Sequence, residues 1–119
     1  AADTKRQPFA QAAFGAVGLE TLLPAALGVH HDGADLSLVL AALTSTPARI
    51  LGIEGGRLAK GAPADVILFD PGEPFVVEAE KLHSRAKNTA FEGRKFQGRV
   101  RQTYVGGACV FDASKERNA

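Results

Sequence analysis

Along the first half of the chain, apolar residues recur with the spacing of an α-helix, whereas in the second half they form short runs typical of strands. The clearest helical segment is "LSLVLAAL", in which Leu36, Val39, Leu40 and Leu43 fall at positions i, i+3, i+4 and i+7. This spacing puts the four side chains on one helix face. Asp35 directly precedes them and is a favourable N-cap, so we predict a helix that begins after it.

Two further helices are predicted on either side of this one. Thr21 can cap the segment "LLPAALGVHH", and residues 1–18 before it form an irregular loop. In "STPARILGI" we predict Thr46 as the cap, Pro47 at the first helical position and Gly52 as the stop.

About four short strands are predicted in the second half. The run "DVILFD" (65–70) is continuously apolar between two aspartates, which indicates a strand buried on both faces. Weaker strand patterns cover 75–78 and 99–105, and Gly106-Gly107 predicts a hairpin turn into "ACVFD". Helices followed by strands indicate an α+β order rather than repeated βαβ units.

Composition and charge exclude several classes of protein. The 119 residues are 45% hydrophobic with a formal net charge of +1, so nothing indicates electrostatic binding to nucleic acid or to an anionic membrane. Arg94, Lys95 and Arg99 are interpreted as a solvated strand edge. No apolar run reaches the length of a membrane span, and no signal-peptide pattern follows Ala1. The chain does not begin with methionine, which suggests a processed or truncated product.

Residues with reactive side chains are few and scattered. Cys109 is the single cysteine, which fits a reducing cytoplasmic location, and we expect it to be buried and inert. The three histidines, at positions 30, 31 and 83, lack the spacing of a helical metal pair and are expected to be solvated or capping residues. Glu20 is a possible general base, but a first-turn glutamate stabilised by the helix dipole explains it more simply. We assign Asp3 as an ordinary terminal charge.

Four blocks together resemble the dihydroorotase family of the amidohydrolase superfamily. They are "FGAVGLETLLPAAL", "LSLVLAALTSTPARILGI", "GGRLAKGAPADVILFD" and "KNTAFEGRKFQGRV". The family usually reads N-T-P-F-x-G where this chain has Asn88, Thr89, Ala90, Phe91 and Gly93. "TKRQPFAQAA" is similar to an insertion found in proteobacterial members.

The resemblance implies a C-terminal portion of an enzyme. Residues 1–53 would supply the loop and last helices of a (β/α)₈ barrel, and residues 54–119 would supply short strands of a small composite β-sandwich domain. The other strands of that domain, and zinc ligands such as an H-x-H motif, a carboxylated lysine and an aspartate, would lie upstream. This chain would then ligate no metal and contribute no catalytic residue, and alone we expect it to be inactive.

Phe14 and Gly15 are the predicted substrate-binding residues, because the resembled enzymes meet their substrate there through backbone groups. The family more often has proline where this chain has Ala13. An ordinary glycine-rich loop is the alternative interpretation.

Several functions remain open under this resemblance. The whole enzyme would interconvert N-carbamoyl-L-aspartate and dihydroorotate in pyrimidine biosynthesis. The alternatives are another cyclic amidohydrolase (allantoinase or hydantoinase), a metal-free structural partner of aspartate transcarbamoylase, and a separate β-rich binding module. We expect a homo-oligomer, and we expect the stripe of residues 36–43 and the strand 65–70 to need cover from another polypeptide.

Overall fold

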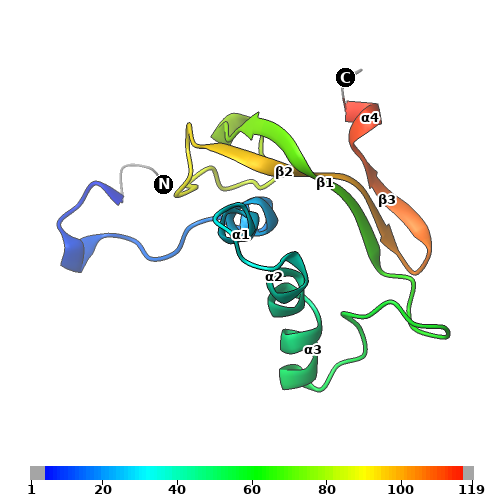
Figure 1. Ribbon diagram of the computed structural model, residues 1–119. Coiled ribbons are helices and arrows are strands. Elements are labelled where there is room, and N and C mark those ends of the chain that lie inside the picture. Colours follow the sequence, from blue (N-terminus) through cyan, green and yellow to red (C-terminus); the bar gives the residue numbers. More distant parts are fainter. Residues whose placement is uncertain (1–4, 117–119) are drawn as a thin grey trace.

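The computed structural model describes residues 5–116 and shows a helix packed against one side of a small antiparallel sheet (Figure 1). The α-helices are α1 (Leu22–His31), α2 (Leu36–Leu43), α3 (Ser45–Leu51) and α4 (Ala113–Glu116). Two short 3₁₀ helices are η2 (Phe9–Gln11) and η3 (Ala79–Lys81). In this part of the chain no helix has the length and apolar character needed to cross a membrane. The predicted α+β content is confirmed.

The sheet has three strands in the order β1 (Val66–Val76), β2 (Lys95–Val105) and β3 (Ala108–Asp112). Of the two runs predicted as separate strands, 65–70 and 75–78, residues 66–70 and 75–76 belong to one strand with a register shift between Asp70 and Pro74, and residues 65, 77 and 78 lie outside it. The described residues therefore form three strands instead of four. The predicted hairpin turn at Gly106-Gly107 joins β2 to β3, as expected.

Helix α1 packs closely on β2, the central strand. Leu27 of α1 is completely buried, and a Cβ atom at Gly98 of β2 would lie 2.3 Å from its Cδ1 atom. Gly98 also has φ +111°, a conformation that L side chains rarely adopt. Position 98 must therefore be glycine for the helix to approach the strand this closely. The strand-edge interpretation of Arg94, Lys95 and Arg99 is wrong, since Lys95 and Arg99 lie on the central strand β2 and Arg94 directly precedes it, although all three residues are exposed.

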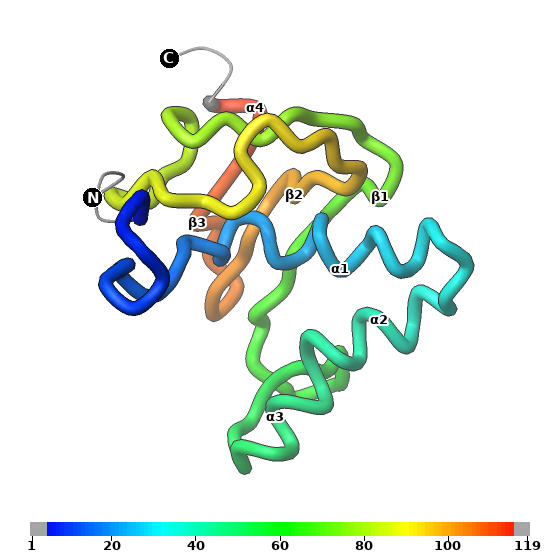
Figure 2. Tube along the Cα trace, turned by 90° about the vertical axis from the view of Figure 1, so that its left-hand side faces the viewer, coloured from blue at the N-terminus to red at the C-terminus, as the bar shows by residue number. Residues whose placement is uncertain are grey.

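Helices α2 and α3 continue away from the sheet (Figures 1 and 2). The predicted cap of α2 is confirmed, because Asp35 Oδ1 accepts hydrogen bonds from the backbone of Ser37 and Leu38. Helix α3 begins at Ser45, so the predicted start at Thr46 and Pro47 is wrong. Thr44 takes the capping position there.

The apolar surface left uncovered is not the one expected from the sequence. Within the predicted stripe Val39 is buried and the three leucines are half-buried, because α2 contacts both α1 and α3. On α2 and α3 and just after them, other apolar residues are exposed: Leu38 (71% exposed), Ile50 (76%), Leu51 (70%), Ile53 and Leu58.

Strand β1 and Cys109 are also less covered than predicted. Ile67 is 41% exposed and Leu68 is 51% exposed, so residues 65–70 are not buried on both faces by the described chain. Both flanking strands of the sheet are edges, and α1 covers β2 rather than β1. Cys109 lies on the edge strand β3 and is exposed, which contradicts the expected burial.

Candidate functional site

The loop that leads into α1 carries the two predicted substrate-binding residues. Phe14 is fully exposed, and Gly15 has φ +82° with open space where a Cβ atom would lie. An L side chain at position 15 would therefore be strained by its backbone conformation rather than by crowding from the described residues. We call residues 12–18 the entry loop.

The entry loop is fixed by contacts to its main-chain oxygens. Lys5 Nζ donates to Ala13 O at 2.9 Å and also to Gly15 O. Asn88 Nδ2 donates to Gly15 O at 3.2 Å. Val17 N donates to Asn88 O at 3.4 Å. Val17 also forms an isolated parallel β-bridge with Thr89. Two segments 73 positions apart thus lie side by side (Figure 2).

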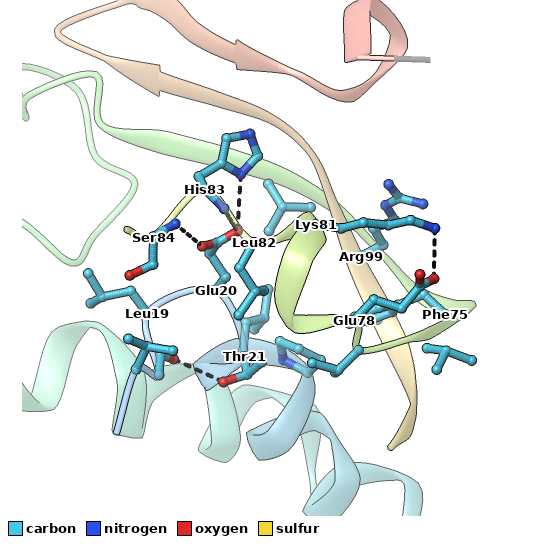
Figure 3. Close-up of a pocket in the computed structure, with 18 of the residues that line it drawn as sticks. Leu19, Glu20, Thr21, Phe75, Glu78, Lys81, Leu82, His83, Ser84 and Arg99 are labelled. Atoms are coloured by element: carbon cyan, nitrogen blue, oxygen red, sulfur yellow. Dashed lines mark hydrogen bonds and ion pairs between the residues drawn. The ribbon is translucent and has the colours of Figure 1, made fainter. Parts of the chain in front are cut away.

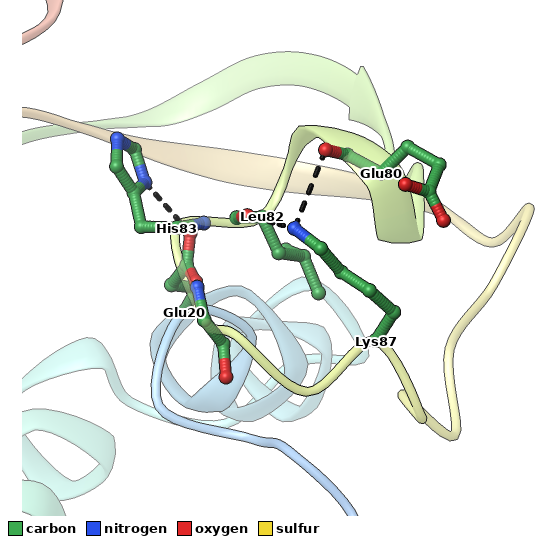
Figure 4. Close-up of polar contacts among 6 residues, drawn as sticks. Glu20, Glu80, Leu82, His83 and Lys87 are labelled. Carbon is green, nitrogen blue, oxygen red and sulfur yellow. Dashed lines mark hydrogen bonds and ion pairs between the residues drawn. The ribbon is translucent and has the colours of Figure 1, made fainter. Parts of the chain in front are cut away.

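The segment that holds the entry loop is itself held by side chains of its own motif. Lys87 Nζ donates to Leu82 O at 2.6 Å and to Glu80 O at 3.4 Å (Figure 4). Glu92 Oε2 accepts from Ala79 N at 2.6 Å. We call residues 79–94 the platform segment. Sequence reasoning assigned Asn88 no role in binding the loop, although the block "KNTAFEGRKFQGRV" was one of those that carried the family resemblance.

Glu20 connects the platform segment to the start of α1. Its carboxylate accepts from His83 N and Ser84 N, both at 3.1 Å, and pairs with His83 Nδ1 at 3.0 Å (Figures 3 and 4). The expected first-turn role is wrong, because Glu20 precedes the cap residue Thr21 and α1 has no acidic residue in its first turn. Thr21 is buried, and its hydroxyl donates to Gly18 O at 3.3 Å instead of capping the helix.

These contacts change the acidity of Glu20. Partial burial alone would raise the pKa of Glu20, but hydrogen bonds from the side chain and backbone of His83 and from the backbone of Ser84 outweigh it. The pKa of Glu20 therefore lies below its ordinary value. A carboxylate that is ionised and already shared among three donors is a structural clamp rather than a general base at neutral pH.

An open cleft of about 1130 Å³ lies beside the clamp, between the start of α1, the platform segment and one face of the sheet (Figure 3). Its lining is mainly apolar, with Ala16 and Val17 of the entry loop on one side. Lys81 and Glu78 form an ion pair of 2.7 Å at its rim. The His83 ring meets the Phe111 ring edge-on, with centroids 6.1 Å apart.

The described residues do not fit a metal centre. Within 5–116, no group of three or more His, Cys, Asp or Glu side chains gathers where an ion could be held. His30 Nδ1 is 2.8 Å from Ala34 O, at the end of α1, and the ring of His31 lies 5.5 Å from that of His30 between centroids. Asp3 lies outside the described residues. No step of a reaction can therefore be derived through a metal from the residues that the structure describes.

Comparison with known proteins shows what this arrangement is similar to. Residues 10–111 match the amidohydrolase family. The chain is 44% identical over 114 residues to a dihydroorotase of Anaplasma phagocytophilum, covering 95% of this chain and 26% of that protein. It is 43% identical over 110 residues to a dihydroorotase of Pelobacter propionicus, covering 92% and 26%. The resemblance to dihydroorotases is confirmed.

Solved structures of hydantoinases share this fold at lower sequence identity. An L-hydantoinase (dihydropyrimidinase) from Arthrobacter aurescens superposes with a TM-score of 0.79 at 31% identity, covering 86% of this chain and 24% of that one. A D-hydantoinase gives a TM-score of 0.82 at 26% identity, covering 92% and 25%. The chain thus spans about a quarter of the length of the proteins it matches.

Proposed function

Because the chain belongs to the amidohydrolase family, we propose that it is part of a longer hydrolase that opens and closes cyclic amides. The substrate pair that we propose is dihydroorotate and N-carbamoyl-L-aspartate. The observation that carries this choice is the 44% identity to a dihydroorotase across 95% of the chain, against 31% for the L-hydantoinase.

The parts of the chain would divide between two regions of the whole enzyme. We propose that residues 1–53 complete a (β/α)₈ barrel and that residues 54–119 contribute strands to a small β-sandwich domain. Zinc, which the family resemblance implies, would be held by residues outside this chain. We place the whole enzyme in the cytoplasm as a homo-oligomer, with aspartate transcarbamoylase as a candidate partner.

The entry loop is the part of this chain that we propose to meet substrate, at Phe14 and Gly15. A carboxylate on the ring accepts hydrogen bonds, so it needs donors. The carbonyl oxygens of Ala13 and Gly15 are already bound by Lys5 and Asn88. Peptide N–H groups of the entry loop are therefore the groups that we propose to bind the carboxylate.

The substrate assignment is tested with the full-length protein that contains this segment. We expect it to release N-carbamoyl-L-aspartate from dihydroorotate with kcat/KM at least about 100-fold above that for hydantoin or allantoin, since a site built to bind a carboxylate rejects rings that lack it. A preference for hydantoin or allantoin would replace the assignment by the rival amidohydrolase. Loss of all three activities in a folded protein would favour the structural-partner alternative.

The role of the entry loop is tested by Gly15→Val in the same protein. A β-branched residue at φ +82° is strained by roughly 1–2 kcal/mol, so the loop should shift and KM should rise about tenfold. Gly28→Val is the control outside the loop, because Gly28 lies in α1, has open space and lacks a left-handed φ. Equal KM values for the two variants and the wild type would remove the loop from the site.

A further inference from the structure

We infer that Asn88 is a positioning residue for the substrate-side loop, acting through the carbonyl group of Gly15. The inference rests on the proposed function, since it assigns the entry loop a substrate. Asn88 itself would touch no substrate. Its side-chain amide would set the orientation of one peptide plane, and that plane would present a donor to a carboxylated ligand.

The first step is the double contact that Asn88 makes. Its side chain donates to Gly15 O at 3.2 Å, while its own carbonyl accepts from Val17 N at 3.4 Å. The two bonds bracket Ala16 between them. Since one bond fixes the peptide before Ala16 and the other fixes the amide after it, the orientation of Ala16 is determined from both sides.

The second step is the geometry of the peptide unit. A peptide is planar and trans, so its C=O and the following N–H point in opposite directions. When Gly15 O is directed at the Asn88 amide, the N–H of Ala16 is directed away from the platform segment. Ala16 is exposed. The contact at Gly15 therefore orients the donor of an exposed residue on the side of the loop opposite to Asn88.

The third step is the stiffness of the support. The platform segment is held by hydrogen bonds at several points. Glu20 binds it at His83 and Ser84, Lys87 binds Leu82, and Glu92 binds Ala79.

The same segment also packs on the sheet. Phe91 lies edge-on against the buried Phe96 of β2, with ring centroids 5.2 Å apart. A bond from Asn88 thus ties the entry loop to the sheet and to α1, whereas Lys5 reaches it from the segment that precedes the loop.

The test compares Asn88→Asp with Asn88→Ala and Thr89→Ala in the full-length enzyme. Aspartate keeps the size of asparagine but replaces the donor that faces Gly15 O with an acceptor oxygen. Alanine removes the side chain and serves if the aspartate variant does not fold. Thr89→Ala is the control, because the Thr89 hydroxyl accepts only from the nearby Phe91 N at 3.2 Å in the contacts described.

We expect KM for dihydroorotate to rise about 5- to 10-fold in Asn88→Asp and Asn88→Ala, the equivalent of one lost hydrogen bond, with kcat within about twofold of wild type. Thr89→Ala should leave both constants within about twofold. A fall in kcat with unchanged KM, or equal effects of all three variants, would overturn the inference.

A second readout needs no substrate. Amide hydrogen exchange in a peptide covering residues 9–19 should become faster in both Asn88 variants, including at Val17, and should stay unchanged in Thr89→Ala. If the wild type proves inactive on dihydroorotate, the proposed function fails while this arm still decides whether Asn88 holds the loop. Wild-type exchange in folded Asn88→Asp would overturn the inference whatever the activity.

Discussion

Two regions of the molecule are built in opposite ways. Around α1, β2 and the platform segment, side chains bind main-chain groups at fixed distances, and Leu27 and Val77 are almost completely buried. Around α2 and α3, the surface carries uncovered apolar side chains, with Leu38, Ile50 and Leu51 each at least 70% exposed. The first region holds the largest fully buried side chains of the described residues, whereas the second exposes several of its large apolar ones.

The difference shows where the described residues bury their apolar side chains and where they leave them exposed. Burying a large aliphatic side chain contributes about 1.5–3 kcal/mol, so a cluster of uncovered ones is a substantial unused source of stability. Clusters of this kind mark surfaces that pack against another protein or domain. This agrees with a chain that spans about a quarter of its relatives. We propose that the longer enzyme covers the α2–α3 surface.

The largest expected effect is the loss of the contact between α1 and β2. Leu27→Ala should lower the free energy of unfolding of the full-length protein by about 2–5 kcal/mol, because it leaves a cavity against Gly98. Leu22→Ala is the control in the same helix, since Leu22 is 55% exposed. Urea unfolding measures both. Equal losses for the two variants would show that the first region is not self-contained.

The next effect tests whether the α2–α3 surface is covered in the full-length protein. If it is, Ile50→Ala should cost about 1.5–3 kcal/mol, although Ile50 is 76% exposed in this chain. Ile50→Lys should then cost more than Ile50→Ala, because a buried charge is penalised. Urea unfolding measures the free energy of unfolding of both variants. A change of less than about 0.5 kcal/mol in each would instead indicate that this surface stays exposed to water.

A smaller effect is expected at the Glu20 clamp. Glu20→Gln keeps the shape but weakens the bonds to His83 and Ser84, so it should cost about 1 kcal/mol at pH 7. Because the folded-state pKa is lowered, the contribution is fully present above the unfolded-state pKa, near 4.5, and is lost as pH falls through the folded-state value. The difference between wild type and variant should therefore shrink below about pH 4.5.

Denaturant titrations at pH 7 and at pH 3.5 measure this difference. Glu80→Gln is the control, since the Glu80 side chain is exposed and the contact described for this residue uses its main-chain oxygen. A cost for Glu20→Gln that is the same at both pH values would show that the charge of the clamp does not contribute.

The sequence predicted local features of the fold better than those set by distant contacts. Asp35 identified the start of α2 because an N-cap bond is made within three residues. The joining of 66–70 with 75–76 into one strand was not predicted, because Pro71 and Pro74 favour separate strands, whereas the chain pairs with β2 on both sides of residues 71–73. The burial of 65–70 was wrong for the same reason: it depends on what lies over the sheet.

The candidate site divides in the same way. Phe14 and Gly15 were predicted from the family resemblance. The φ of +82° at Gly15 is a conformation that favours glycine at this position. Their support by Asn88 was not predicted, since the two segments are 73 positions apart and no periodic pattern links them. Glu20 was read as a local helix-dipole residue, yet its partners lie 63 and 64 positions away.

The smallest expected effect concerns the edge strand β3. Cys109 is exposed, and its Sγ donates to Phe111 O at 3.3 Å, a weak bond within its own strand. Cys109→Ser should therefore change the free energy of unfolding by less than about 0.5 kcal/mol. If β3 is also an edge in the full-length protein, the native thiol should react with iodoacetamide as fast as in the unfolded protein, as measured by mass spectrometry of the labelled peptide. Protection that disappears only on unfolding would place another polypeptide over β3, and the uncovered region would then extend from α2–α3 to this side of the sheet.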